Sequence, residues 1–282
     1  MKFICLTYLL VFSVSISAQY TEIATFEFQQ FNGNTKENTN YNTTVFNAGL
    51  LLGFNTNSNK TTTVFFRPSY QQRIITGPNP LRLYKPELIT GISHNFNDSW
   101  KIQGFALARL ASNFNSIDNE HYQFGGGALA TYKSSERLSY RFGAYARKQP
   151  KGVLAFPFIG LNYRFGTNRW QLNVLLPQYA YLKYTVKESS WYAGLRLNYV
   201  TEQYRTELNN TSLHYIELTE FTSEVFIEYH LTKGLVVYGR AGFLNYQKYE
   251  LYNEQDLLLN PNTREVKDVL TGRIGLAYRI LN

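Results

Sequence analysis

Single basic side chains recur in stretches of this sequence where polar and apolar residues alternate, and their immediate neighbours are mostly apolar or aromatic. Arg196, for example, lies between Leu195 and Leu197, which a β-strand would direct to the opposite face. An arginine that faces the middle of a membrane costs about 2 to 4 kcal/mol, so these residues are expected to point inward from a membrane-spanning wall. The basic residues assigned to this inner face are Arg67, Lys101, Arg109, Arg141, Arg147, Arg164, Lys183, Arg196, Arg240, Arg273 and Arg279.

Two functions fit an inner face of this kind. A positively charged lumen would favour small polar or anionic solutes, as rings of Arg and Lys do in anion pores. Alternatively, the charges would pair inside a non-conducting barrel that serves as a structural or partner subunit, because buried charges need partners. The acidic residues available to pair with them are Glu27, Glu87, Glu224, Glu228 and Asp268. We expect passage of solutes, with the structural role as the main rival.

A hydrolytic site has only one candidate neighbourhood. A lipid hydrolase would need a His beside a Ser and an acid or amide, and Asp118 and His121 occur close together. Ser112 and Ser116 precede them, but Gly-x-Ser-x-Gly and His-Glu-x-x-His motifs are absent. Glu202 and the other acidic residues of the expected outer loops lack calcium-loop spacing and are expected to be solvated. We therefore expect no enzyme, cofactor or metal site; a lipid-modifying hydrolase is the remote alternative.

The strands that must position these side chains are clearest at the end of the chain. Between Leu270 and Ile280, apolar residues alternate with polar or small ones at a period of two, which indicates a strand with one apolar face. A similar alternation recurs along the chain. The sequence has 23 Tyr and 20 Phe, yet its mean hydropathy is −0.30. Many aromatics with modest hydropathy are typical of a transmembrane barrel, because half of each strand faces water or the lumen.

Short polar turns separate the expected strands, and each of the three tryptophans follows one. Because Trp prefers the membrane–water interface, Trp100, Trp170 and Trp191 are expected to form an aromatic girdle at the periplasmic rim. The predicted fold is all-β: a transmembrane, antiparallel, up-and-down barrel of about 12 to 14 strands without a plug domain. The count depends on Pro177, which is expected at the tip of a short hairpin, since Pro cannot donate to a central ladder.

The N-terminus has the features of a secretory signal peptide. A basic residue and an apolar stretch precede small residues that end at Ala18. Residues 1–18 are therefore expected to be the signal peptide and residues 19–282 one barrel domain. Its removal would take away Cys5, the only Cys, so no disulfide is expected. The net charge of +8 does not indicate nucleic acid, because the basic residues are spread singly through an exported chain.

Several stretches resemble a family of bacterial outer-membrane β-barrels catalogued as domain of unknown function 6268. They are residues 110–114, 156–159, 170–184, 228–233 and 273–278. The resemblance implies a single barrel in the outer membrane of a Gram-negative bacterium; the family has no assigned activity, so it assigns no functional residue. The last strand also resembles the signal read by the barrel-assembly machinery, which implies that machinery as a partner besides outer-membrane lipid. The residues that carry this likeness are Arg273, Gly275, Tyr278 and Ile280.

Overall fold

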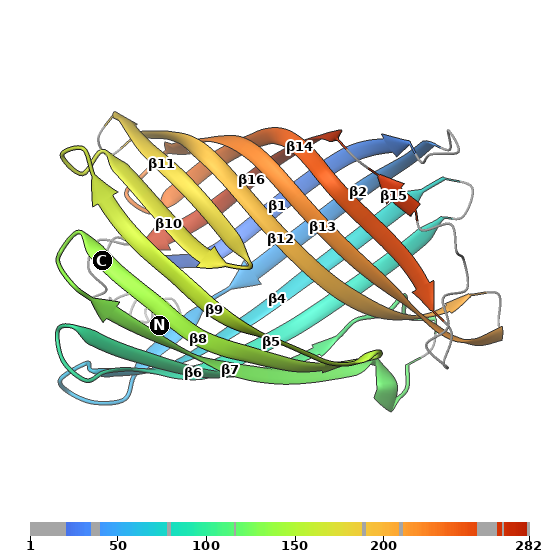
Figure 1. Ribbon diagram of the computed structural model, residues 1–282, viewed down its shortest axis with the longest axis horizontal. Coiled ribbons are helices and arrows are strands. Elements are labelled where there is room, and N and C mark those ends of the chain that lie inside the picture. Colours follow the sequence, from blue (N-terminus) through green and yellow to red (C-terminus); the bar gives the residue numbers. More distant parts are fainter. Residues whose placement is uncertain are drawn as a thin grey trace, which may run out of the picture.

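The protein is an all-β, closed antiparallel barrel (Figure 1). The computed structural model describes residues 21–34, 40–77, 80–115, 117–187, 190–208, 211–252, 264–266 and 268–280, so the expected signal peptide lies outside the described residues. The strands are β1 (Thr21–Asn34), β2 (Asn40–Leu50), β3 (Leu52–Asn55), β4 (Thr62–Thr76), β5 (Leu81–Asn95), β6 (Trp100–Leu110), β7 (Tyr122–Lys133), β8 (Leu138–Gln149), β9 (Gly152–Phe165), β10 (Trp170–Leu176), β11 (Tyr179–Lys187), β12 (Trp191–Leu208), β13 (Thr211–His230), β14 (Leu235–Tyr252), β15 (Arg264–Val266) and β16 (Val269–Ile280).

The wall of the barrel has 14 strands. β2 and β3 both pair with β4 and form one interrupted strand, and β15 and β16 both pair with β14 in the same way. β1 pairs with β16 and closes the ring. The predicted fold class and the higher of the two strand counts are confirmed. The segment around Pro177 is a hairpin, as expected, because β10 pairs with β11 on either side of this proline.

Side chains alternate between the lumen and the outside of the barrel. In β16, Thr271 and Arg279 are buried, whereas Leu270 and Ile274 are 69% and 60% exposed. Exposed apolar side chains also cover the outer faces of the other strands, such as Ile92 of β5 and Val225 of β13. Hydrocarbon satisfies no backbone hydrogen bond and admits no exposed charge. Where adjacent strands pair, the ladder meets the first demand, and the apolar belt meets the second. In the described part of the chain, no helix is long and apolar enough to span a membrane.

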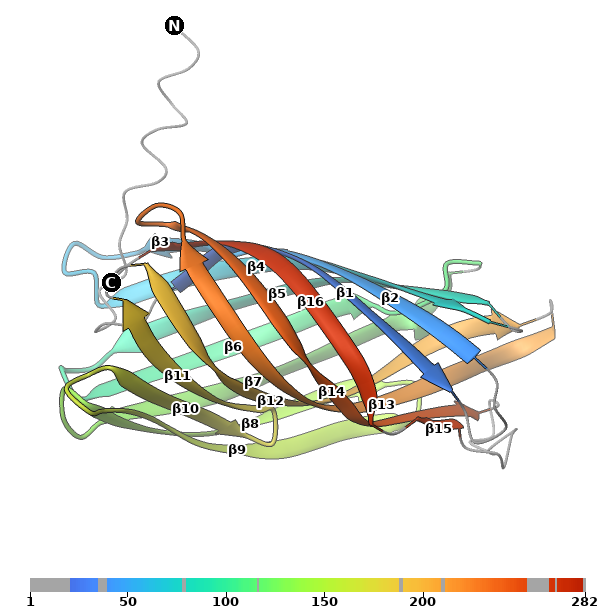
Figure 2. The ribbon, with the colours of Figure 1, turned by 90° about the horizontal axis from the view of Figure 1, so that it is seen from above.

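The two ends of the barrel differ. β1 begins and β16 ends at the same end, which we call the terminal rim; the opposite end is the loop rim (Figure 2). Each of the three tryptophans begins a strand at the terminal rim and packs at a tilted angle against a tyrosine of a neighbouring strand. The ring centroids are 4.9 Å apart for Trp100 and Tyr132, 4.6 Å for Trp170 and Tyr184, and 4.5 Å for Trp191 and Tyr229.

The height of the wall is uneven. β10 and β11 have 7 and 9 residues, whereas β12 and β13 have 18 and 20. The β10–β11 hairpin therefore ends part-way along the barrel while its neighbours β9 and β12 continue toward the loop rim (Figure 1). This difference in length shapes the candidate site.

Glycines on the lumen face make room for aromatic rings. A Cβ atom at Gly194 would lie 2.6 Å from the Phe226 ring, closer than real side chains approach one another. We expect Gly194→Val to lower the free energy of unfolding by about 1 to 3 kcal/mol, because overpacking forces rings and backbone to shift. Urea unfolding of the refolded protein, followed by tryptophan fluorescence, measures this. Gly104→Val is the matched control, since a Cβ there meets nothing within 4 Å; equal losses in both variants would contradict the packing argument.

Candidate functional site in the barrel lumen

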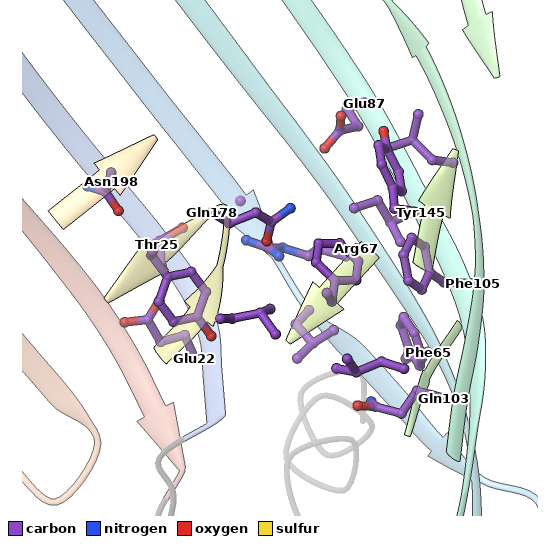
Figure 3. A pocket seen from close by; sticks show the side chains of 18 of the residues that line it. Glu22, Thr25, Phe65, Arg67, Glu87, Gln103, Phe105, Tyr145, Gln178 and Asn198 are labelled. Carbon is purple, nitrogen blue, oxygen red and sulfur yellow. The ribbon is translucent and has the colours of Figure 1, made fainter. Parts of the chain in front are cut away.

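The lumen contains a cavity of about 1210 Å³. Nine of the eleven basic residues that sequence analysis assigns to the inner face line it, together with Lys85; Arg164 and Arg273 lie outside its lining. Its acidic lining residues are Glu22, Glu87, Glu202 and Glu228, so basic groups outnumber acidic ones by ten to four. Figure 3 shows Arg67 between two walls of this cavity, with Phe65, Phe105 and Tyr145 grouped on one of them.

Some of the predicted basic residues pair with carboxylates. Glu27 of β1 forms ion pairs with Arg240 of β14 at 2.9 Å and with Arg273 of β16 at 3.1 Å. Arg273 also lies 2.6 Å from Glu224. These contacts link strands on both sides of the β1–β16 seam, so they hold the ring closed where its two ends meet.

Two further ion-paired arginines lie along the lumen. Arg279 of β16 is 2.7 Å from both Glu22 and Glu228. Arg109 is 3.8 Å from Glu87, which is a loose contact. Four of the five acids expected to pair therefore do so. The fifth, Asp268, is exposed and has no ion pair with any described residue.

Five basic residues of the cavity have no carboxylate within ion-pair distance among the described residues. They are Arg67, Lys101, Arg141, Arg147 and Arg196. The guanidinium of Arg196 donates to the side chain of Asn198 at 3.0 Å. Lys183 also lines the cavity, with its ammonium 5.0 Å from the centre of the Tyr192 ring. The lumen thus carries an excess of positive charge that internal pairing does not cancel, which is the condition for attracting anions.

Three arginines of the cavity carry nitrogen atoms without a hydrogen-bond partner. These atoms are Nη2 of Arg109, Nε of Arg141 and Nε of Arg147, and no described residue accepts from them. Arg141 uses its other nitrogens to donate to Asn173, to the Val174 carbonyl and to the Tyr179 hydroxyl. Buried donors without acceptors are costly, but these nitrogens are almost inaccessible, so an anionic group in the cavity would accept from them only after the side chains shift.

The loop rim is constricted by β12 and β13. β5 and β12 lie on opposite sides of the ring, yet Lys85 of β5 pairs with Glu202 of β12. Tyr204 donates to Gln71 of β4 at 2.8 Å, and Arg73 of β4 forms a two-point ion pair with Glu220 of β13. The outer part of β12 is buried on both faces, from Glu202 to Thr206. Opposite walls therefore meet at this level.

This constriction corrects one expectation. Glu202 is not a solvated loop residue, because β12 continues to Leu208 and turns this side chain toward the opposite wall. The residues of the constriction that sequence analysis missed are Gln71, Arg73, Lys85, Tyr204 and Glu220. The only local signal for them is the run from Thr201 to Thr206, which is too polar on both faces for a strand that faces lipid.

The suspected hydrolytic residues do not assemble into a nucleophile and base. His121 contacts Asp118 at 2.8 Å, but its Nε2 atom has no hydrogen-bond partner and the residue is fully buried. The hydroxyl of Ser112 accepts from the Phe114 amide instead, and Ser116 lies outside the described residues. Asp118 caps the short 3-10 helix η2 (Asn119–His121). Among the described residues, no group of three or more His, Cys, Asp or Glu side chains could hold a metal ion.

The loop between β6 and β7 lowers the pKa of the Asp118 carboxyl group. Partial burial would raise its pKa, but the hydrogen bonds from His121 and from the Glu120 amide, with the charge of Arg205, hold the pKa below the usual value. Arg205 of β12 in turn pairs with Glu120 at 2.6 Å. The loop between β6 and β7 is thereby fastened to the inward-turned end of β12, and its titratable groups have a structural role.

Comparisons with known proteins identify one family and several distantly similar solved structures. A family model described as "Domain of unknown function (DUF6268)" matches residues 12–257. Among curated protein sequences, none matches this chain significantly. Solved structures that resemble it include the NanC porin (8% identity, TM-score 0.43, 90% of this chain and 100% of that chain). Another is the COG4313 outer membrane channel from Pseudomonas putida F1 (6% identity, TM-score 0.48, 94% and 98%). A third is the KdgM porin in complex with disordered oligogalacturonate (10% identity, TM-score 0.40, 90% and 98%).

Proposed function

The protein belongs to the DUF6268 family, and from the geometry of its lumen we propose that it is an outer-membrane channel for small solutes that carry an anionic group. The observation that supports this most is the cavity, in which ten basic residues face four acidic ones. Five of the basic residues have no carboxylate partner among the described residues. A barrel with only a structural role would be expected to neutralise the buried one of these, Arg147, internally, because an unpaired buried charge costs stability.

The orientation of the barrel follows from its two rims. Short turns and both ends of the described chain lie at the terminal rim, which is the arrangement of a periplasmic rim. The loop rim with its constriction would then face outward. Anions would reach the cavity from the periplasm or through the constricted outer end, so the channel is expected to have a small conductance.

Charge neutralisation tests the proposed selectivity. In a planar bilayer with a KCl gradient, we expect the wild-type protein to give a reversal potential of the sign that shows chloride preference. The double variant Arg67→Gln, Lys101→Gln should move this potential toward zero, because neither side chain has an ion-pair partner in the described structure and both line the cavity. These substitutions change the charge of the lumen and are not expected to change the size of the pore. The conductance at high salt should therefore change little.

Lys148→Gln is the matched control, because Lys148 is exposed on the outer side of β8. It should leave the reversal potential unchanged. A folded wild-type barrel that passes no ions, or one that prefers potassium, would refute the proposed channel and favour the non-conducting structural role.

A further inference from the structure

The wall of the barrel is interrupted above the β10–β11 hairpin. Leu176 of β10 is opposite Ile159 of β9, and Tyr179 of β11 is opposite Asn198 of β12. Beyond these positions, residues 152–158 of β9 pair only with β8 among the described strands. Residues 199–208 of β12 pair with β13, and on their other edge the Tyr199 amide donates to the Gln178 carbonyl and the Arg205 amide to the Ala111 carbonyl. The outer end of β12 therefore turns inward to the β6–β7 connection, and the edge of β9 is left without a strand beside it.

The interruption borders the apolar outer surface of the barrel. On β9, Val153 and Ile159 point outward and are 72% and 67% exposed, so the apolar surface continues past the tip of the hairpin. On β12, Leu197 and Tyr199 are exposed on the same outer surface. Because lipid cannot satisfy unpaired backbone groups, strand edges at this surface need an aqueous cavity or protein beside them.

The cavity reaches both edges. Its lining includes the consecutive residues Leu154, Ala155 and Phe156 of β9, and the consecutive residues 199–201 of β12. Consecutive residues of a strand point to opposite faces, so a cavity that touches three in a row extends around the strand edge. Pro177 at the tip of the hairpin completes this border. The lumen therefore extends into the wall between β9 and β12.

The cavity behind this gap is apolar on one side and basic on the other. Tyr145, Phe158 and Leu175 form a buried cluster, and Phe105 and Phe156 pack against it. Arg147 lies at the edge of this cluster, where its guanidinium donates to the Tyr145 hydroxyl at 3.3 Å. Arg109, Arg141 and Arg147, each with one nitrogen that lacks a hydrogen-bond partner, line the same cavity. One ligand chemistry fits both parts: an apolar chain that ends in an anionic group.

We propose that the gap between β9 and β12 is a lateral portal through which single-chain amphipaths with a carboxylate pass between the lumen and the outer leaflet. The apolar chain would lie along the aromatic cluster, and the carboxylate would accept hydrogen bonds from Arg147 and Arg109. This inference rests on the proposed function, whose solute class it narrows, and it accounts for a cavity that continues sideways where the outer end of the barrel is constricted.

Equilibrium dialysis of isotope-labelled dodecanoate against the protein in phospholipid nanodiscs, with empty nanodiscs subtracted, tests the portal. We expect saturable binding of dodecanoate and at least about tenfold weaker binding of dodecanol or acetate, because each lacks one half of the recognised chemistry. Arg147→Gln should weaken dodecanoate binding by about tenfold or more. Ala155→Trp, which places a large ring at the gap, should abolish it. Ala241→Trp on the exposed outer face of β14 is the matched control and should bind like the wild type.

The outcomes separate this inference from the proposed channel. Chloride current with no preference for dodecanoate over dodecanol would leave the channel standing and overturn the portal. Equal binding by the Ala155→Trp variant and the wild type would also overturn it. Dodecanoate binding that depends on Ala155 and Arg147 in a barrel that carries no chloride current would support the portal and refute the anion channel. Ala155 is exposed, so Ala155→Trp is expected to fold. It therefore tests the portal even if Arg147→Gln does not fold.

Discussion

Replacing Glu27 with glutamine is expected to cost about 3 to 5 kcal/mol of unfolding free energy, the usual loss when one partner of a buried ion pair is removed. Glu27 bonds to two arginines, and Tyr238 donates to it at 3.1 Å. Glutamine has the same size but no charge, so Arg240 would be left without a carboxylate in a part of the lumen with excess positive charge. Arg273 would keep only Glu224.

Urea unfolding followed by tryptophan fluorescence measures this loss. Glu136→Gln, in an exposed turn between β7 and β8, is the control and should change the free energy by no more than about 0.5 kcal/mol. The double variant Glu27→Gln, Arg240→Gln should recover part of the loss, because the arginine that lacked a partner is removed as well. An unchanged unfolding midpoint for Glu27→Gln would show that the seam is held by its backbone ladder alone.

Reversing the charge of Glu202 is expected to raise single-channel conductance several-fold. Glu202 pairs with Lys85 across the lumen. In the Glu202→Lys variant, two ammonium groups would repel each other where an ion pair now holds the opposite walls together, and the inward-turned end of β12 would be released. The constriction at the loop rim would then widen. Conductance in planar bilayers at high salt is the appropriate measurement, because salt reduces the effect of the added charge on local ion concentration.

The charge swap Lys85→Glu, Glu202→Lys restores an ion pair with its sign reversed, so it should return the conductance toward that of the wild type. If both variants conduct equally well, the contact between β5 and β12 does not restrict the path. A several-fold increase in the single variant alone would show that this contact narrows the outer end.

Period-two patterning predicts the strands because alternation is a local property of the chain. The lipid-facing residues of β16 and the hairpin at Pro177 follow from neighbouring residues alone, and both agree with the structure. The basic residues of the inner face were predicted in the same way. The ion pairs that these residues form were not predicted individually. Glu27 and Arg273, for example, are far apart in sequence and meet only where the barrel closes.

Two features of the site have no adequate local signal. The constriction joins Lys85 and Glu202, which lie on opposite walls, and a polar run such as Thr201–Thr206 equally suits a solvated loop. The gap in the wall depends on the relative lengths and register of four strands, β9 to β12. The shortness of the two strands around Pro177 was visible in the sequence, but the cavity behind them required the three-dimensional arrangement.

The central claim is that the lumen attracts anions through basic groups that internal acids do not neutralise. Anomalous diffraction from crystals of the folded barrel soaked in bromide tests it most directly, because bromide positions are then observed individually. We expect bromide inside the lumen, beside Arg67 and between Arg109 and Arg147. Bromide found only on the outer loops, with none in the lumen of a well-ordered barrel, would contradict it.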